Sequence, residues 1–120
     1  MPDYHLAETE AKFAELIWAH GPLSSADLVK LAAEALDWKK STTYTMLKRL
    51  CQRELFANDG GIVKVVISRD EFKAAQSEEF IDETFGGSLP LFLTAFTKRN
   101  KLSAKEIEEI RNLIDSYKEE

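Results

Sequence analysis

The chain has 120 residues and a formal net charge of −5; 44% of its residues are hydrophobic and 31% are charged. This is the composition of a soluble globular protein with one domain, or with a small domain and an appendage. No apolar run approaches the roughly 20 residues that cross a bilayer, and no secretory signal is recognisable. With a single cysteine, Cys51, an internal disulfide is excluded. We therefore expect a cytoplasmic protein without membrane insertion.

The charge is unevenly distributed. Between residues 38 and 69, seven cations accompany two carboxylates, which gives this segment a net charge of +5 and leaves −10 for the rest of the chain. The negative total argues against a protein that coats nucleic acid without specificity. One basic segment in an acidic chain fits local docking on DNA instead.

The first third of the chain predicts two helices. Residues 6–20 place apolar side chains at helical spacing and end at a Gly-Pro pair. Residues 24–36 open with Ser24 and Asp27, a start that resembles a capping box, and carry an apolar stripe of Leu and Ala. Both helices are amphipathic, so we expect them to pack together.

The stretch from residue 38 to 55 predicts a third helix with two different faces. Thr43, Met46, Leu47 and Leu50 form a packing face. At 100° per residue, the opposite face carries hydroxyls, an amide and cations without a carboxylate. Taken alone, this helix favours an ordinary solvated face, although such groups also donate to phosphates and base edges. The polar side chains are Ser41, Thr45, Lys48, Arg49 and Gln52.

The next segment changes to strand periodicity. Residues 58–61, Asn-Asp-Gly-Gly, predict a turn between a short strand at 55–57 and a β-branched strand at 62–67. A hairpin directly after the third helix is the wing of a winged helix-turn-helix fold, and Lys64 could reach a phosphate from it. A hairpin this small has to pack on the helices.

The last 50 residues predict three further helices. Capping boxes start at Ser68 and at Ser103, and Gly86-Gly87 separates the first of these helices from a short apolar one. The apolar surplus favours homodimerisation; the alternative is that the helices fold back on the N-terminal domain. The expected interface residues are Phe80, Ile81, Phe85, Leu89, Leu91, Phe92, Leu93, Phe96, Ile107, Ile110, Leu113 and Ile114.

Nothing in the sequence indicates an enzyme. His5 and His20 are isolated, and the acidic residues at 78–83 are typical of a solvated helix face. There is no phosphate-binding loop and no nucleophile–base constellation. Cys51 has no metal-ligand spacing around it and is expected to be a small buried hydrophobe. We therefore predict no catalytic residues, no cofactor and no metal site.

The chain resembles the penicillinase-repressor family (BlaI/MecI/CopY type) from about residue 6 to residue 117, which is nearly its whole length. Three segments carry the resemblance. ETEAKFAELIW, at residues 8–18, is similar to the opening of the family. WKKSTTYTMLKRL, at 38–50, resembles its signature through Trp38, Thr42, Thr45, Arg49 and Leu50. LSAKEIEEIRNLID, at 102–115, is similar to its last helix.

The resemblance implies a mainly α protein. Residues 1–69 would form a winged-helix DNA-binding domain of three helices and a β-hairpin wing, and residues 70–120 a C-terminal helical dimerisation region. It also implies a homodimeric repressor of an inverted-repeat operator, often with TACA/TGTA-like half-sites. In penicillinase regulation a membrane sensor-protease pathway leads to repressor cleavage.

The sequence departs from the family in places. The cleavage point, typically Asn-Phe, aligns with Ala95-Phe96. Copper-responsive members have a Cys-x-Cys tail, which is missing here. Arg53-Glu54 replaces a usual Lys-Gly, and Tyr44 stands where the family is often basic.

We therefore expect steric repression, with the start of the third helix in the major groove. A protein-interaction adaptor that does not bind DNA is the alternative, since winged helices serve both roles. It is also open whether Arg49 contacts phosphate or supports the helix through an internal acid. The expected DNA-binding residues are Lys39, Lys40, Ser41, Thr42, Tyr44, Thr45, Lys48, Arg49 and Lys64.

Overall fold

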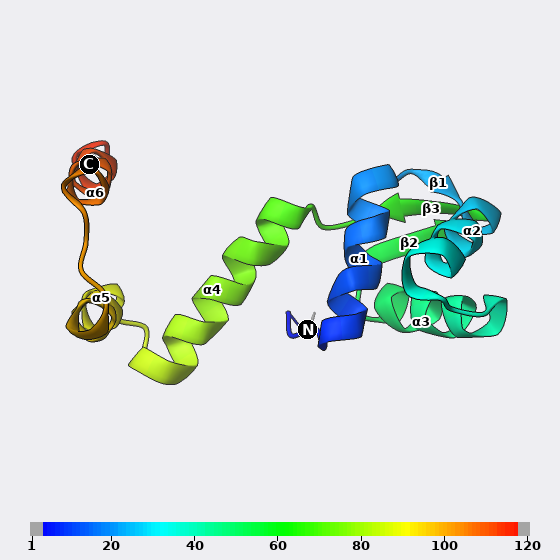
Figure 1. Ribbon diagram of the computed structural model, residues 1–120, viewed down its shortest axis with the longest axis horizontal. Coiled ribbons are helices and arrows are strands. Elements are labelled where there is room, and N and C mark those ends of the chain that lie inside the picture. The colour runs from blue at the N-terminus through cyan, green and yellow to red at the C-terminus, as the bar shows by residue number, and fades with distance from the viewer. Residues whose placement is uncertain (1–3, 118–120) are drawn as a thin grey trace. The chain divides into compact units, whose positions relative to one another are not determined.

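The structure is a computed structural model that describes residues 4–117 (Figure 1). It is mainly helical, with one small antiparallel sheet. The chain forms two compact units, one that runs to Glu79 and one that starts at Phe80, so the division falls inside a single helix. That helix is α4 (Arg69–Phe85), and the sequence-based boundary after residue 69 lies at its start. Among the described residues, no helix has the length and apolar character needed to cross a membrane.

Helices α1 (Glu8–His20), α2 (Ser25–Leu36) and α3 (Lys40–Gln52) form most of the first unit. The predicted start of α2 is confirmed, because the Ser24 Oγ accepts the backbone N–H of Asp27 at 3.0 Å. This bond satisfies one of the donors that every helix leaves open at its first turn. Figure 1 shows the three helices gathered around the small sheet, and α2 contacts both α1 and α3.

The sheet has three strands in the order β1-β3-β2: β1 (Leu23–Ser24), β2 (Phe56–Asp59) and β3 (Ile62–Val65). The hairpin prediction is confirmed, but its limits were wrong. The first strand runs to Asp59, which shortens the turn to two glycines, and the second strand ends at Val65 rather than at 67. Strand β1 was not predicted from the sequence. Its two residues pair with β3 across about 40 positions of the chain.

The hairpin turn requires glycine. Gly60 and Gly61 have φ values of 60° and 89°, a left-handed pair that connects two strands with their natural twist. The Asn58 side chain accepts the N–H of Gly61 at 3.1 Å. The carbonyl of Gly61 in turn accepts the N–H of Ser25 at 2.8 Å, so the wing is anchored to the first residue of α2.

One continuous core holds the first unit together. Trp18 lies at its edge, with its ring 5.5 Å from that of Phe56 and 5.3 Å from that of Phe72. The indole N–H donates to the carbonyl of Ile67 at 2.9 Å, which fixes the chain where it leaves the wing. The largest fully buried side chains are Phe13, Phe56, Ile17, Leu28, Leu47, Leu50, Leu55, Val63 and Thr43. Three helices and a wing around such a core constitute a winged helix.

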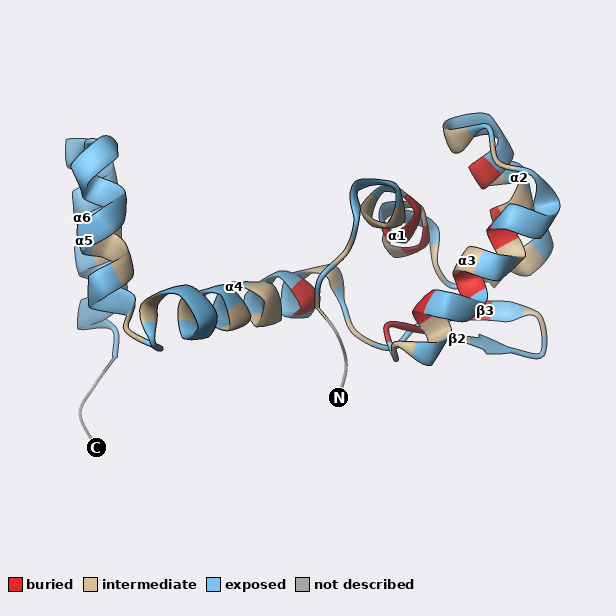
Figure 2. Ribbon diagram, turned by 90° about the horizontal axis from the view of Figure 1, so that it is seen from below, coloured by how far each residue is buried: buried red, intermediate tan, exposed pale blue. Residues whose placement is uncertain are grey.

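The second unit contains the end of α4, α5 (Leu89–Arg99) and α6 (Ala104–Asp115). The capping box predicted at Ser103 is present, because Ser103 and Glu106 exchange hydrogen bonds at 3.0 Å. The one predicted at Ser68 is present too, at the start of α4 in the first unit, where Ser68 and Glu71 exchange hydrogen bonds at 3.1 Å. Within the described part of this unit, however, no residue is buried. The buried positions are confined to the winged helix and to Phe72 at the start of α4, and Figure 2 shows α5 and α6 without a buried position.

Candidate nucleic-acid interface

Helix α3 is fixed by the side that faces the core. Thr43, Leu47 and Leu50 are buried, and Met46 is half-buried, as the predicted packing face requires. The Thr43 hydroxyl donates to the carbonyl of Lys39 at 3.1 Å, so this buried polar side chain is satisfied within the first turn. The packing face thus sets the rotation of α3 and determines which side chains face solvent.

The exposed side of α3 is polar, cationic where it is charged, and free of carboxylates. Lys39, at the N-cap position, makes no side-chain cap hydrogen bond to the backbone N–H groups of the first turn. These N–H groups form the positive end of the helix, where anions bind favourably. The exposed side chains of the helix and its start are Lys39, Lys40, Ser41, Thr42, Thr45, Lys48, Arg49 and Gln52.

Tyr44 differs from the other predicted contacts because it is half-buried and packs against the core. Its hydroxyl lies 3.1 Å from the Oγ of Ser25, the first residue of α2. Since Ser25 also bonds the wing turn through its N–H, this one residue connects α3, α2 and the wing. Tyr44 therefore contributes to the relative placement of the two helices of the helix-turn-helix.

Arg49 forms an ion pair with Glu10 of α1. This is an internal acid of the kind that the sequence analysis considered as an alternative to a phosphate contact. The Nη1 of Arg49 lies 3.6 Å from the Oε2 of Glu10, and the Nη1 of Arg53 lies 3.5 Å from the Oε1 of the same carboxylate. Arg53 also donates to the carbonyl of His5. The sequence reading missed Glu10 as a partner of α3. The available signal was two arginines four residues apart, Arg49 in α3 and Arg53 at its C-cap, which can share one carboxylate.

Lys64 extends from the wing as expected and is exposed, but it too has an acidic partner. Its Nζ lies 2.9 Å from the Oδ2 of Asp59, on the neighbouring strand beside the turn. Lys39, Lys40 and Lys48 form no ion pair within the part of the chain that the structure describes. The candidate interface therefore contains two kinds of cation, paired and unpaired.

Cys51 lies on α3 beside its packing face. It is half-buried against the core, and burial raises the pKa of its thiol. A raised pKa keeps the thiol protonated and unreactive near neutral pH, which fits the predicted role as a small hydrophobe. Across residues 4–117 there is no cluster of three or more His, Cys, Asp or Glu side chains that could hold a metal ion.

The predicted dimerisation residues lie on the second unit and remain accessible to solvent. Phe80, Phe85 and Phe92 contact one another with ring centroids 5.6 to 6.1 Å apart, and Phe96 extends the group from Phe92 at 5.9 Å. Even so, 49% of Phe80 is exposed. Ile81, Phe85, Phe92, Leu93 and Ile110 are half-buried, whereas Leu89, Leu91, Phe96, Ile107, Leu113 and Ile114 are exposed.

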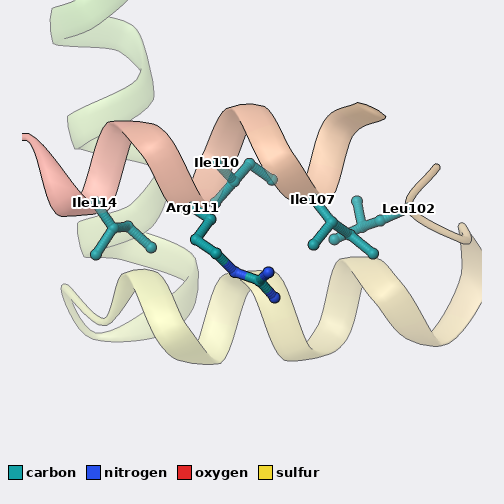
Figure 3. Close-up of a pocket in the computed structure, with 5 residues that line it drawn as sticks. All are labelled: Leu102, Ile107, Ile110, Arg111 and Ile114. Atoms are coloured by element: carbon teal, nitrogen blue, oxygen red, sulfur yellow. The ribbon is translucent and has the colours of Figure 1, made fainter. Parts of the chain in front are cut away.

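A shallow apolar groove of about 210 Å³ runs along α6. Four aliphatic side chains and one arginine line it: Leu102, Ile107, Ile110, Ile114 and Arg111. Figure 3 shows these side chains projecting from α6 and from the segment before it. Three of the interface residues expected on the last helix therefore line one groove, and a single copy of the chain leaves it open.

Comparison with known proteins relates the entire architecture to one family. The family model of the penicillinase repressor matches residues 6–116. The penicillinase repressor of Bacillus licheniformis is 24% identical over 117 residues, which cover 94% of this chain and 91% of the relative. The methicillin resistance regulatory protein MecI of Staphylococcus aureus is 24% identical over 116 residues, covering 93% and 94%. A penicillinase repressor of Staphylococcus aureus is 23% identical over 104 residues. The chain belongs to the penicillinase-repressor family, whose members are transcriptional regulators and not enzymes.

Proposed function

We propose that this protein is a cytoplasmic, homodimeric transcriptional repressor that binds an inverted-repeat operator through α3 and the wing. The observation that carries the proposal is the exposed side of α3, which offers hydroxyls, an amide and cations on a winged-helix scaffold without a single carboxylate. Phosphates and the acceptor edges of bases are matched by donors of this kind. A bound dimer would exclude the transcription machinery from the operator.

The side chains of α3 divide into two groups by chemistry. Ser41, Thr42 and Thr45, near the start of the helix, have short hydroxyls suited to base edges or nearby phosphates. Tyr44, fixed by Ser25, would present its ring edge beside them. The cations suit the phosphate backbone, which positions a protein without reading sequence. They are Lys39, Lys40, Lys48, Arg49 and Lys64.

A second copy of the chain is the proposed occupant of the apolar surface on the second unit. Its exposed groups continue along α5 and α6, where the isoleucine-lined groove lies. Burying such a surface against its own copy forms a closed two-fold interface. Two-fold symmetry is also what an inverted repeat requires of its reader, so a dimer would explain both features.

Release from DNA would occur through this same unit. The names of the relatives point to penicillinase and methicillin resistance, so we propose genes of the β-lactam-resistance type as targets, with a membrane sensor-protease pathway upstream. The family cleavage point aligns with Ala95-Phe96, which are both exposed inside α5. A protease needs an extended segment, so α5 would have to unwind locally first. Alanine in place of the usual asparagine would make this bond a poor substrate.

The proposal is tested by selecting sequences from random duplex DNA with the purified full chain at near-physiological salt. Enrichment of an inverted repeat, with half-sites about one helical turn apart, is expected for a dimeric winged helix. If a folded dimer enriches no sequence, the repressor proposal is contradicted, and the protein-interaction adaptor becomes the favoured hypothesis.

A pair of substitutions tests the surface itself. Replacing both Lys48 and Arg49 with alanine should weaken DNA binding and lower the dependence of log K on log salt by as much as about 1.8, because each phosphate contact contributes roughly 0.9. Fluorescence anisotropy across a salt series measures both quantities. The matched control replaces Lys30 and Lys73, two exposed cations of α2 and α4. Equal effects of the two double variants would remove α3 from the interface.

A further inference from the structure

Two cations of the interface form ion pairs with carboxylates, whereas Lys39, Lys40 and Lys48 form none among the described residues. This difference suggests that the affinity for DNA is regulated. Arg49 is held by Glu10 and Lys64 by Asp59, at 3.6 Å and 2.9 Å. Both acids belong to the same unit as the cations they hold. A carboxylate and a phosphate are similar ligands for a cation, so the acid competes directly with DNA.

The Glu10 carboxylate is built into the fold and can release one partner without losing the other. Only 12% of its side chain is exposed, and its Oε1 accepts the N–H of Ala7 at 2.9 Å, which caps α1. Arg53 is 17% exposed, whereas Arg49 is 55% exposed. If Arg49 turns to a phosphate, Glu10 keeps Arg53 and the cap. The exchange therefore leaves no buried charge without a partner. An unpaired buried charge would destabilise the fold.

The wing pair is simpler, because both side chains are largely in solvent. Asp59 is 71% exposed and Lys64 is 53% exposed. Water replaces Lys64 around Asp59 when the lysine leaves, so the exchange costs little. After that exchange, the acid remains beside the hairpin turn and near any phosphate that Lys64 contacts, where its charge is repulsive.

We propose that Glu10 and Asp59 are built-in competitors of the DNA backbone, which keep the affinity of this winged helix for DNA below the value that its cations alone would give. The proposal rests on the proposed DNA-binding function. Its effect is independent of base sequence, because only phosphate contacts are involved. Operator and non-operator DNA are therefore weakened by the same factor, so the competition lowers the overall affinity for DNA without changing the preference for the operator.

The test uses the full chain and a labelled duplex of mixed sequence, so that no operator has to be known. Three variants each remove one negative charge: Glu10→Gln, Asp59→Asn and, as the control, Glu34→Gln. Glutamine retains the oxygen that caps α1. Glu34 lies on α2, is exposed, and has no ion pair among the described residues. Anisotropy titrations at low salt should give affinities about two- to fivefold higher for the first two variants, the range that exposed ion pairs support. The control should remain close to the wild type.

The outcomes separate this proposal from the one it rests on. Absence of any wild-type binding to the duplex at low salt contradicts the DNA-binding function. Binding by the wild type without a gain in Glu10→Gln and Asp59→Asn contradicts the competition alone. An equal gain in Glu34→Gln also overturns it, since net charge would then be the cause.

A second background isolates the Arg49 contact. In an Arg49→Ala chain, the gain from Glu10→Gln should disappear, because the cation that it releases is gone. A gain that persists there would mean that Glu10 acts by repelling DNA and not by holding Arg49. Circular dichroism confirms that each variant is folded, and Asp59→Asn, on the exposed wing, keeps the test valid if Glu10→Gln is unstable.

Discussion

Both units contain helices that begin with a side-chain cap, yet among the described residues only the first unit has a buried core. In the winged helix, Phe13, Ile17 and Leu28 are fully buried. In the second unit, the described helices include residues as large as Phe80 and Phe92 and bury none of them. The apolar residues of the first unit are buried within one chain, whereas those of the second stay accessible to solvent in a single copy.

The comparison also shows that helix signals and burial are separate properties. Helix α6 has a complete capping box and the most regular apolar stripe of the chain, but no residue of it is buried. Helix α3 has no side-chain cap and is held by three buried side chains. Local hydrogen bonds therefore specify where a helix begins, whereas packing decides whether one copy of the chain is sufficient.

The largest expected effect would come from creating a cavity in the first unit. Replacing Phe13 with alanine removes a buried ring that lies 5.1 Å from that of Trp38, and should cost roughly 3–5 kcal/mol of folding free energy. Urea denaturation followed by circular dichroism measures this loss. Phe80→Ala removes the same ring from a site that is 49% exposed in one copy, and it serves as the control at concentrations where the chain is monomeric. Similar losses in both variants would contradict the difference between the units.

A charge placed in the groove of α6 should break the association of the second unit. Ile114→Asp removes a large aliphatic group from each copy, and we expect a loss of roughly 3 kcal/mol per dimer, about a hundredfold in the dissociation constant. Sedimentation equilibrium provides the measurement. Asn112→Asp adds the same charge about 160° away around α6. A wild type that stays monomeric, or equal weakening by both variants, would show that this face is not the interface.

The smallest expected effect sharpens the account of the first unit. Glu54, between α3 and β2, has a φ of 66°, in the left-handed region that suits glycine. The sequence resemblance places a glycine at this position in the family, and the structure gives the reason. Glu54→Gly should therefore stabilise the winged helix by about 1 kcal/mol, whereas Glu54→Ala should not. A higher urea midpoint for the alanine variant would refute backbone strain as the cause.

Much of the fold could be predicted because its signals are local. Ser24, Ser68 and Ser103 each start a helix by bonding to a residue three positions later, and Gly60-Gly61 makes a turn with its own backbone. Strand β1 could not be predicted, since two residues carry no periodicity and its pairing depends on β3. The same holds for the end of β3, where the N–H groups of Val66 and Ile67 both turn to the carbonyl of Leu55.

The candidate site was predictable in its composition but not in its pairing. The spacing along α3 identified Lys48 and Arg49 as exposed, because rotation about a helix axis follows from sequence alone. The contact between Arg49 and Glu10 joins residues 39 positions apart, and only the packing of α1 on the rest of the unit brings them together. Contacts between distant side chains depend on tertiary structure, which a single sequence does not reveal.

The placement of the aromatic side chains has a consequence for spectroscopy. The chain has two tryptophans, Trp18 and Trp38, and both pack in the winged helix, against Phe56 and Phe72 and against Phe13. Intrinsic tryptophan emission therefore reports on the first unit alone, whereas the far-ultraviolet signal of the helices reports on both. Melting curves that coincide for the two signals would show that the units unfold together, and curves that separate would give each unit its own transition. The protein thus contains a natural fluorescent label on one of its two parts.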